Sequence, residues 1–224
     1  MSQFTPRFED IRLILSIQGY QLNNQFIVRE VGYWSPKLCG VIQFNTKLNL
    51  TRLDTFSIKN IHILENEIHG IKLKKIAENG MASSEVGSIL KCLYQVTKIE
   101  GSRADYIGIL REEKVSSILF KAGLGKYVLE LEDLQILNKS NTSMPSFGDF
   151  KYIIGTEISK YKPCSLHEPL RTSETPICAR AKAEIVANHL QQINAQQQQQ
   201  PKPIMYQNHG NQDLYSYIVQ QTTV

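Results

Sequence analysis

Residues 12–34 read RLILSIQGYQLNNQFIVREVGYW, and this stretch decides the first part of the fold. An apolar run lies on each side of the pair Asn23 and Asn24. Asparagine tolerates the left-handed backbone that a tight turn requires, so the pattern predicts a β-hairpin. A further β-prone run, residues 39–46 (CGVIQFNT), predicts a third strand. Together the three strands would form an antiparallel meander.

The rest of the chain alternates between helical and β-prone patterns. The strongest helix prediction is the last one, which is dominated by Ala, Lys, Glu and Leu. From the sequence we expect a helix over 83–96, a β-prone run over 94–99, a helix over 103–114, a strand over 126–134, a loop over 138–148 and a helix over 176–193. This order predicts an α/β protein. A mixed sheet that begins with a three-strand meander and is flanked by helices is the ribonuclease H-like layout.

Composition predicts one domain with a polar tail. The chain has 224 residues, of which 42% are hydrophobic and 21% charged, as is usual for globular proteins. We expect a domain over 1–194 and a disordered, glutamine-rich tail over 195–224. No apolar run reaches the ~18–20 residues that a membrane span needs. The first residues lack the layout of a signal peptide, so an intracellular location is expected.

Given an intracellular location, the four cysteines argue against a disulfide scaffold and leave two interpretations, buried apolar thiols or metal ligands. Cys92 lies in an apolar helical pattern and is expected in the core. Cys39 has no histidine or cysteine at ligand spacing. Cys164 and His167 are separated by two residues, and Cys178 opens the last predicted helix. These three residues form an incomplete ligand set, since zinc takes four ligands.

The fourth ligand must come from elsewhere in the chain. His189 follows Cys178 by eleven residues on the same predicted helix, which separates the two by about 16 Å and excludes a shared ion. Glu30 is the better candidate. Strict strand alternation would place it on an apolar face made of Phe26, Val28, Gly32 and Trp34. A buried carboxylate needs a cation or hydrogen bonds. Two interpretations stay open at this point: a metal ligand, or an edge residue that reaches water or an arginine.

The net charge of +4 is mildly basic and compatible with a polyanionic partner. The candidate RNA contacts are the clustered basic residues Lys72, Lys74, Lys75, Arg180 and Lys182. The alternative interpretation is a solvated charged surface.

The order of these elements resembles the MAEL domain of the Maelstrom family. The resemblance rests on a strand, a second strand with Glu30, a distant Cys164-x2-His167 pair and Cys178 at a helix start. It implies that these four residues hold a structural zinc ion on a ribonuclease H-like fold related to DnaQ-type exonucleases. Val28 stands where the family often has proline, which indicates a divergent member.

The sequence does not have acidic residues where the exonucleases related to this family have their catalytic carboxylates. Those enzymes use clustered acids to hold two metal ions. Ser16 and Gln18 stand where an Asp and a Glu would be expected, and Ala183 stands near the place of the last Asp. Glu100 and Asp105 are too scattered to rebuild the cluster. We therefore expect no metal-dependent exonuclease activity; weak, metal-independent RNA cleavage stays open.

The resemblance also implies a function. A catalytically degenerate module would bind single-stranded RNA or protein partners and serve piRNA-guided silencing of transposons in the germline. Its location would be the cytoplasm, the nucleus or perinuclear granules. Two alternatives are an active ribonuclease with unconventional residues and a protein-interaction scaffold derived from a mobile element.

Overall fold

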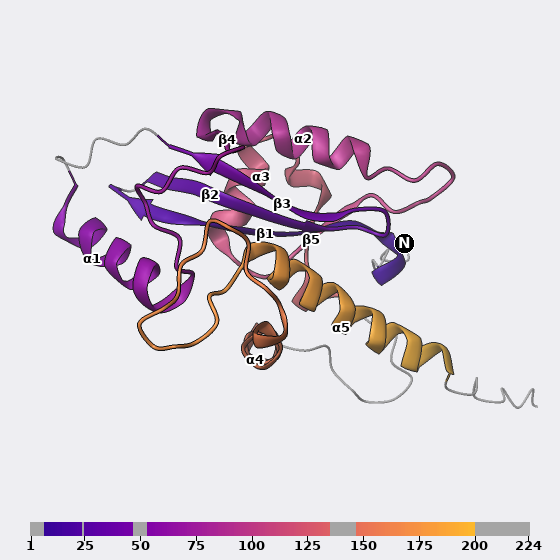
Figure 1. Cartoon of the computed structure of the whole chain (residues 1–224). Helices are drawn as coiled ribbons and strands as arrows, with labels where there is room; N and C mark the ends of the chain where they lie inside the picture. The colour runs from indigo at the N-terminus through magenta and orange to yellow at the C-terminus, as the bar shows by residue number, and fades with distance from the viewer. Residues whose placement is uncertain (1–6, 24, 47–52, 135–146, 200–224) are drawn as a thin grey trace, which may run out of the picture.

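A six-stranded mixed sheet forms the centre of the molecule (Figure 1). The computed structural model describes residues 7–23, 25–46, 53–134 and 147–199. The strand order is β4-β3-β2-β1-β5-β6. The strands are β1 (Ile11–Leu22), β2 (Gln25–Trp34), β3 (Cys39–Asn45), β4 (Met81–Ala82), β5 (Tyr106–Ile109) and β6 (Val128–Glu130).

The predicted meander is confirmed. β1 pairs antiparallel with β2, and β2 pairs antiparallel with β3. Asn23 follows β1 with φ of 43°, the left-handed conformation that favours asparagine in a tight turn. β5 and β6 then extend the sheet in parallel on the other side of β1. The protein is therefore α/β with a mixed sheet, as predicted.

Helices cover both faces of the sheet (Figure 1). α2 and α3 lie on one face, and α1, α4 and α5 lie on the other. The α-helices are α1 (Thr55–Ile63), α2 (Val86–Val96), α3 (Glu113–Lys121), α4 (Phe147–Glu157) and α5 (Ala179–Gln199). Short helical turns are η1 (Phe8–Asp10), η3 (Leu64–Ile68), η4 (Ser83–Glu85), η5 (Gly125–Tyr127), η6 (Leu131–Asp133) and η7 (Ile158–Lys160). Within the described ranges, none of the helices has the length and apolar character needed to cross a membrane.

A separate apolar core fills each face. Under α2 and α3 the core is built from alternate residues of β1, among them Leu13, Leu15 and Ile17. Under α5 the sheet contributes Ile11 and Ile14 to the second core. The contact face of α5 is largely alanine, with Ala179, Ala181, Ala183 and Ala187 all buried. Small side chains let a helix backbone approach the sheet closely, and this proximity positions the site described below.

A β-bulge interrupts the alternation of β2. Gln18 pairs with Glu30 while the next residue, Gly19, pairs with Val28, so Arg29 is an extra residue on β2. A bulge shifts the phase of every side chain that follows it. Val28 consequently packs under α2 and α3, whereas Glu30 points toward α5. The prediction that these two residues share a face is wrong, because strict alternation cannot anticipate a bulge.

Three element predictions are also wrong. Residues 103–114 contain β5, because Ile107 and Ile109 are fully buried between β1 and β6 and their burial overrides local propensity. Residues 94–99 form no strand: α2 runs to Val96, and Thr97 caps it by donating to the carbonyl of Leu93. The predicted tail starts too early, since α5 continues to Gln199; glutamine is a good helix former.

Other predictions have mixed outcomes. The strand over 126–134 is confirmed in a shorter form as β6. Most of the loop predicted over 138–148, and the tail from 200 onward, lie outside the described residues. Cys92 is exposed and does not belong to the core, because the buried stripe of α2 consists of Val86, Leu90, Leu93 and Tyr94.

Candidate metal centre

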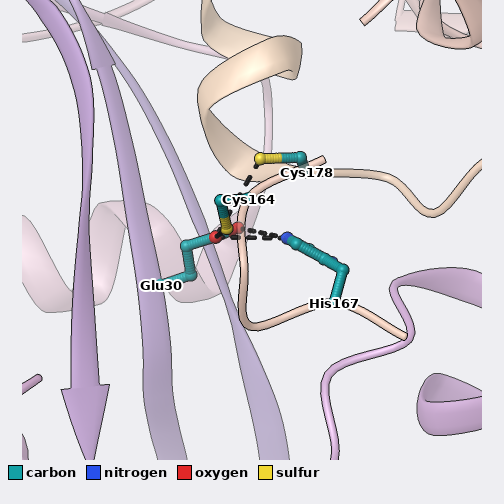
Figure 2. A group of neighbouring side chains, drawn as sticks. All are labelled: Glu30, Cys164, His167 and Cys178. Carbon is teal, nitrogen blue, oxygen red and sulfur yellow. Dashed lines mark hydrogen bonds and ion pairs between the residues drawn. The ribbon is translucent and has the colours of Figure 1, made fainter. Parts of the chain in front are cut away.

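Four side chains from three distant parts of the chain converge beside the first turn of α5 (Figure 2). They are Glu30 of β2, Cys164 and His167 of the loop after η7, and Cys178 immediately before α5. Their candidate ligand atoms all lie within 4.8 Å of one another. This is the set that the sequence and the resemblance predicted. The structure also confirms that His189 is not part of it, since its ring packs against Phe150.

Glu30 is at the centre of the cluster and is fully buried. Its Oε1 lies 2.6 Å from the Cys164 sulfur and 3.1 Å from His167 Nε2. Its Oε2 accepts a hydrogen bond of 2.8 Å from the backbone N–H of Ala179, the first residue of α5. The interpretation in which Glu30 reaches water at a strand edge is therefore wrong. One oxygen is held by the helix and the other faces the sulfur and nitrogen donors.

Gly32 allows α5 to begin directly above β2. A methyl group at this position would lie closer than 3.0 Å to the backbone of Ala179 and Arg180. A Cβ atom essentially never approaches other heavy atoms that closely, so any side chain here would displace the start of the helix. Gly32 lies two residues after Glu30 on the same face of β2. The glycine thus lets Cys178, at the start of α5, lie over the strand that carries Glu30.

The loop that carries Cys164 and His167 is docked onto a second segment. His167 forms an isolated antiparallel bridge with Ile71, and Glu168 donates its N–H to the carbonyl of Gly70 at 2.9 Å. Gly70 has a φ of +66°, and a side chain there would collide with the carbonyl oxygen of Glu168. This contact holds the loop in place, so that Cys164 and His167 lie beside Glu30.

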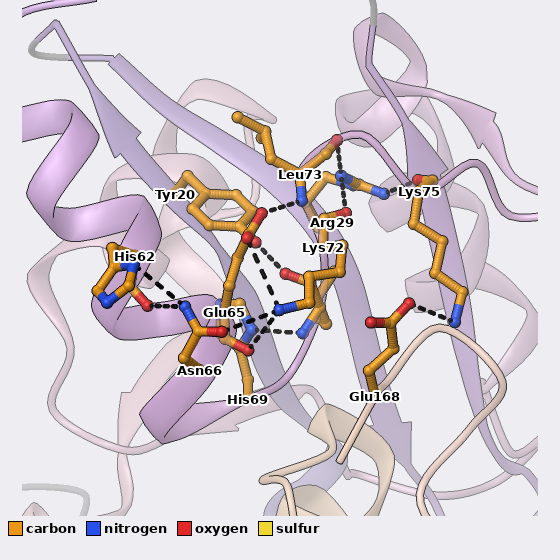
Figure 3. A network of polar contacts seen from close by, with 11 residues as sticks. Tyr20, Arg29, His62, Glu65, Asn66, His69, Lys72, Leu73, Lys75 and Glu168 are labelled. Atoms are coloured by element: carbon orange, nitrogen blue, oxygen red, sulfur yellow. Dashed lines mark hydrogen bonds and ion pairs between the residues drawn. The ribbon is translucent and has the colours of Figure 1, made fainter. Parts of the chain in front are cut away.

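Buried Arg29 anchors that second segment to the sheet (Figure 3). Its guanidinium donates to four backbone carbonyls. The acceptors are the carbonyls of Phe44 at 2.9 Å, Lys72 at 3.2 Å, Leu73 at 2.6 Å and Lys75 at 2.5 Å. Burial lowers the pKa of Arg29 from its ordinary value. Arg29 and its neighbour Glu30 therefore have different roles. Arg29 holds the second segment on the sheet, and Glu30 lies beside the other three candidate metal ligands.

His167 is oriented by its other ring nitrogen. Nδ1 is hydrogen bonded to the backbone carbonyl of His69, which directs Nε2 toward Glu30. A backbone carbonyl on the outer nitrogen is the usual way to orient a metal-binding histidine. Burial by itself lowers the pKa of His167, but hydrogen bonds with Cys178 and Glu30 outweigh it and raise this pKa to about 10.

The two thiols form hydrogen bonds with their neighbours in the cluster. The hydrogen bond with Cys164 lowers the pKa of Cys178 well below its ordinary value, and the reciprocal bond and burial raise the pKa of Cys164. A divalent metal would take the place of the protons in these hydrogen bonds. Two sulfurs, one imidazole nitrogen and one carboxylate oxygen form a donor set that suits tetrahedral zinc. All four positions are filled by protein, as in structural sites.

Gln43 is a feature of the site that sequence reasoning missed. It lies opposite Glu30 in the pairing of β2 with β3, and its side-chain N–H donates to the Cys164 sulfur at 3.0 Å. A donor to a metal-bound thiolate stabilises its negative charge. Only the strand register brings a glutamine next to the ligand, so no local signal in the sequence could have revealed it.

We expect Gln43→Leu to weaken zinc binding about 10-fold or more, because outer partners of metal ligands contribute about 10–100-fold in affinity. Competition with a calibrated chelator measures the change. Gln95→Leu, at an exposed position on α2, is the matched control and should retain wild-type affinity. Equal affinities of the two variants would contradict a role for the N–H···S bond.

Most of the basic residues predicted to contact RNA form contacts within the protein. Lys74 is exposed. The other four have internal partners: Lys72 with Asn66 at 3.1 Å, Lys75 with Glu168 at 3.5 Å, Arg180 with the carbonyl of Lys162 at 3.1 Å, and Lys182 with Glu112. The two carboxylates, Glu168 and Glu112, reduce the positive charge that Lys75 and Lys182 offer to a polyanion.

Of the three residues that the sequence places where exonucleases have acids, Ser16 and Ala183 meet at one cavity, whereas Gln18 does not line it. Ser16, Ala183 and Lys182 line one cavity of about 10 Å³, and Glu112, which follows β5, lines it too. Such a space holds about one water molecule. Asp105 lies elsewhere, at the start of β5, where it pairs with Arg12 at 2.5 Å.

Glu112 is the one carboxylate that the sequence analysis missed at this place, since only the parallel pairing of β5 with β1 brings it there. Its charge is balanced by Lys182. Ser16 and Gln18 each have a buried oxygen without a hydrogen-bond partner among the described residues. The cavity thus combines the hydroxyl of Ser16 with a single neutralised acid, Glu112, which is a weak donor set for magnesium.

Comparisons with protein-family models, with curated proteins and with solved structures found no match to this chain.

Proposed function

We propose that this protein is a divergent Maelstrom-type domain with a ribonuclease H-like fold, stabilised by structural zinc and without two-metal nuclease activity. The observation that carries the proposal is the convergence of Glu30, Cys164, His167 and Cys178 within 4.8 Å. Residues more than a hundred positions apart meet in the combination that the resemblance implies.

The sheet order supports the fold assignment. An antiparallel meander of β1, β2 and β3 is extended by the parallel strands β5 and β6 on the far side of β1, and a long terminal helix packs on the sheet. The ribonuclease H-like layout has the same arrangement. The short strand β4 is an addition at the opposite edge.

Zinc in this proposal has a structural role. It would join β2, the loop after η7 and the start of α5. Bound zinc would also neutralise the buried carboxylate of Glu30. Because protein ligands fill all four positions, the ion has no open position at which to activate water.

The loss of carboxylates around Ser16 supports a binding function over a nuclease function. In the proposal, the module binds single-stranded RNA or protein and acts in piRNA-guided transposon silencing, in the cytoplasm, the nucleus or perinuclear granules. This pathway and these locations derive from the resemblance. Lys74 is the exposed member of the predicted RNA contacts.

Incubation of the purified zinc-loaded protein with labelled single-stranded RNA, with and without magnesium, tests the proposal. We expect RNA binding that weakens with salt, because phosphate contacts release counterions, and no magnesium-dependent cleavage. Glu112→Gln serves as the matched variant, since Glu112 is the acid nearest to the former centre. Magnesium-dependent cleavage that disappears in Glu112→Gln would overturn the proposal in favour of an active ribonuclease.

A further inference from the structure

A groove of about 620 Å³ lies on the face of the sheet opposite the metal centre. It runs over the hairpin ends of β1 and β2, between the start of α2 and one side of α3. Its volume is within the ~300–1,000 Å³ range of ligand sites. The groove does not contain any of the four metal ligands or the residues around Ser16, so an inference from it is independent of the function proposed above.

Two lysines of α3 give the groove its charge. Lys114 and Lys121 both line it, and they are separated by seven residues, or two helical turns. They therefore lie on the same side of α3, about 10 Å apart along the axis. No Asp or Glu is among the described residues that line the groove.

These lysines differ from the basic residues near the metal centre. In the described part of the chain, neither Lys114 nor Lys121 forms an ion pair with a carboxylate. Lys114 lies over the face of the Phe26 ring, with its ammonium 5.4 Å from the ring centre. Both side chains are exposed. Among the described residues, the two positive charges of the groove thus have no carboxylate partner.

The floor between the lysines is apolar. Val28, Val86 and Ile118 contribute to it, together with the Phe26 ring. Hydroxyl groups line the walls, among them that of Ser117, which lies between the two lysines on α3. An apolar surface with charged ends suits a ligand that has an aliphatic side chain between two anionic groups.

We propose that this groove binds an acidic peptide segment of a partner protein, with two carboxylates about 10 Å apart on Lys114 and Lys121 and an aliphatic side chain on the floor between them. A helical peptide with acidic residues seven positions apart and leucine three or four positions after the first has this spacing. Such a peptide matches the groove in charge and in the position of its apolar group.

The groove is less suited to a single-stranded nucleic acid. Binding of that kind uses several cations along the backbone and aromatic faces on which bases stack. Here two lysines are available, and the Phe26 ring already has the Lys114 ammonium over its face. A base would have to displace that contact in order to stack.

Selection from a random peptide display library, with the full chain as target, tests the proposal. We expect wild-type protein to enrich peptides that have two acidic residues flanking leucine, isoleucine or valine. A synthetic peptide of the enriched sequence, labelled with fluorescein, then reports binding by fluorescence polarisation. We expect Lys114→Glu/Lys121→Glu to lower its affinity about 10-fold or more, since each contact becomes repulsive.

Lys59→Glu/Lys98→Glu is the matched control, because both residues are exposed, lie outside the groove and change the net charge equally. It should leave peptide affinity within about 2-fold of wild type. Failure to enrich acidic peptides would overturn the proposal, as would equal loss in both double variants. Loss of labelled single-stranded RNA binding in the groove variant, without any acidic peptide enrichment, would assign the groove to nucleic acid. None of these outcomes depends on the zinc content.

Discussion

Replacing Cys178 by serine is expected to remove the bound zinc and to lower the melting temperature by about 10 °C or more. Cys178 is fully buried at the start of α5, and without its thiolate the set of ligands is incomplete. The buried carboxylate of Glu30 would then lose its cation, at a cost of several kcal/mol. In a domain of this size, 1 kcal/mol corresponds to about 2–4 °C.

Elemental analysis and thermal unfolding measure this effect. Wild-type protein should contain one zinc per chain and should lose the same stability when a strong chelator removes the metal. Cys92→Ser and Cys39→Ser are suitable controls, because both cysteines are exposed and lie outside the cluster. They should retain the zinc and the melting temperature of wild type. A Cys178→Ser protein with full zinc content and unchanged stability would refute a structural metal at this site.

Replacing Gly32 by alanine is expected to destabilise the protein by about 3 kcal/mol or more and to release the zinc. The added methyl group would clash with the backbone at the start of α5, which neither a rotamer change nor a flexible side chain can relieve. A shift of the helix moves Cys178 and the N–H of Ala179 away from Glu30. Backbone displacement thus links the packing of α5 to the metal site.

Gly155→Ala is the matched control for this experiment. Gly155 lies inside α4, and nothing is within 4 Å of a methyl group placed there. Alanine is a better helix former than glycine by roughly 1 kcal/mol, so this variant should be as stable as wild type or slightly more stable. Chemical denaturation of both variants gives the two free energies of unfolding. If Gly32→Ala were as stable as Gly155→Ala and bound zinc equally, α5 would not need the close approach described here.

Local patterns in the sequence predicted the elements that depend on local physics. The Asn23 turn, the three strands of the meander and the helix after Cys178 follow from backbone preferences and apolar periodicity. The segment around Ile107 did not follow, because a short apolar run is compatible with a helix until the neighbouring strands are known. The charged residues that follow this segment favoured the incorrect prediction of a helix.

The four ligands could be named from the sequence by residue chemistry and by a resemblance, and the structure brings them together. Strict alternation, however, gave the wrong neighbours for Glu30. The bulge at Arg29 separates Val28 from Glu30, and it depends on how β2 pairs with β1. The contact of Gln43 with Cys164 likewise depends on strand register.

The residue types in the sequence establish which ligand atoms are available: one carboxylate on an apolar strand, two thiols and an imidazole. The tertiary structure alone decided which of the charged groups are neutralised. Lys182 is paired with Glu112, whereas Lys114 and Lys121 face an open groove. The order of residues along the chain determines which side chains are neighbours only over a few residues. The pairing of charges that are distant in the sequence depends on where the packing of the sheet and helices places them.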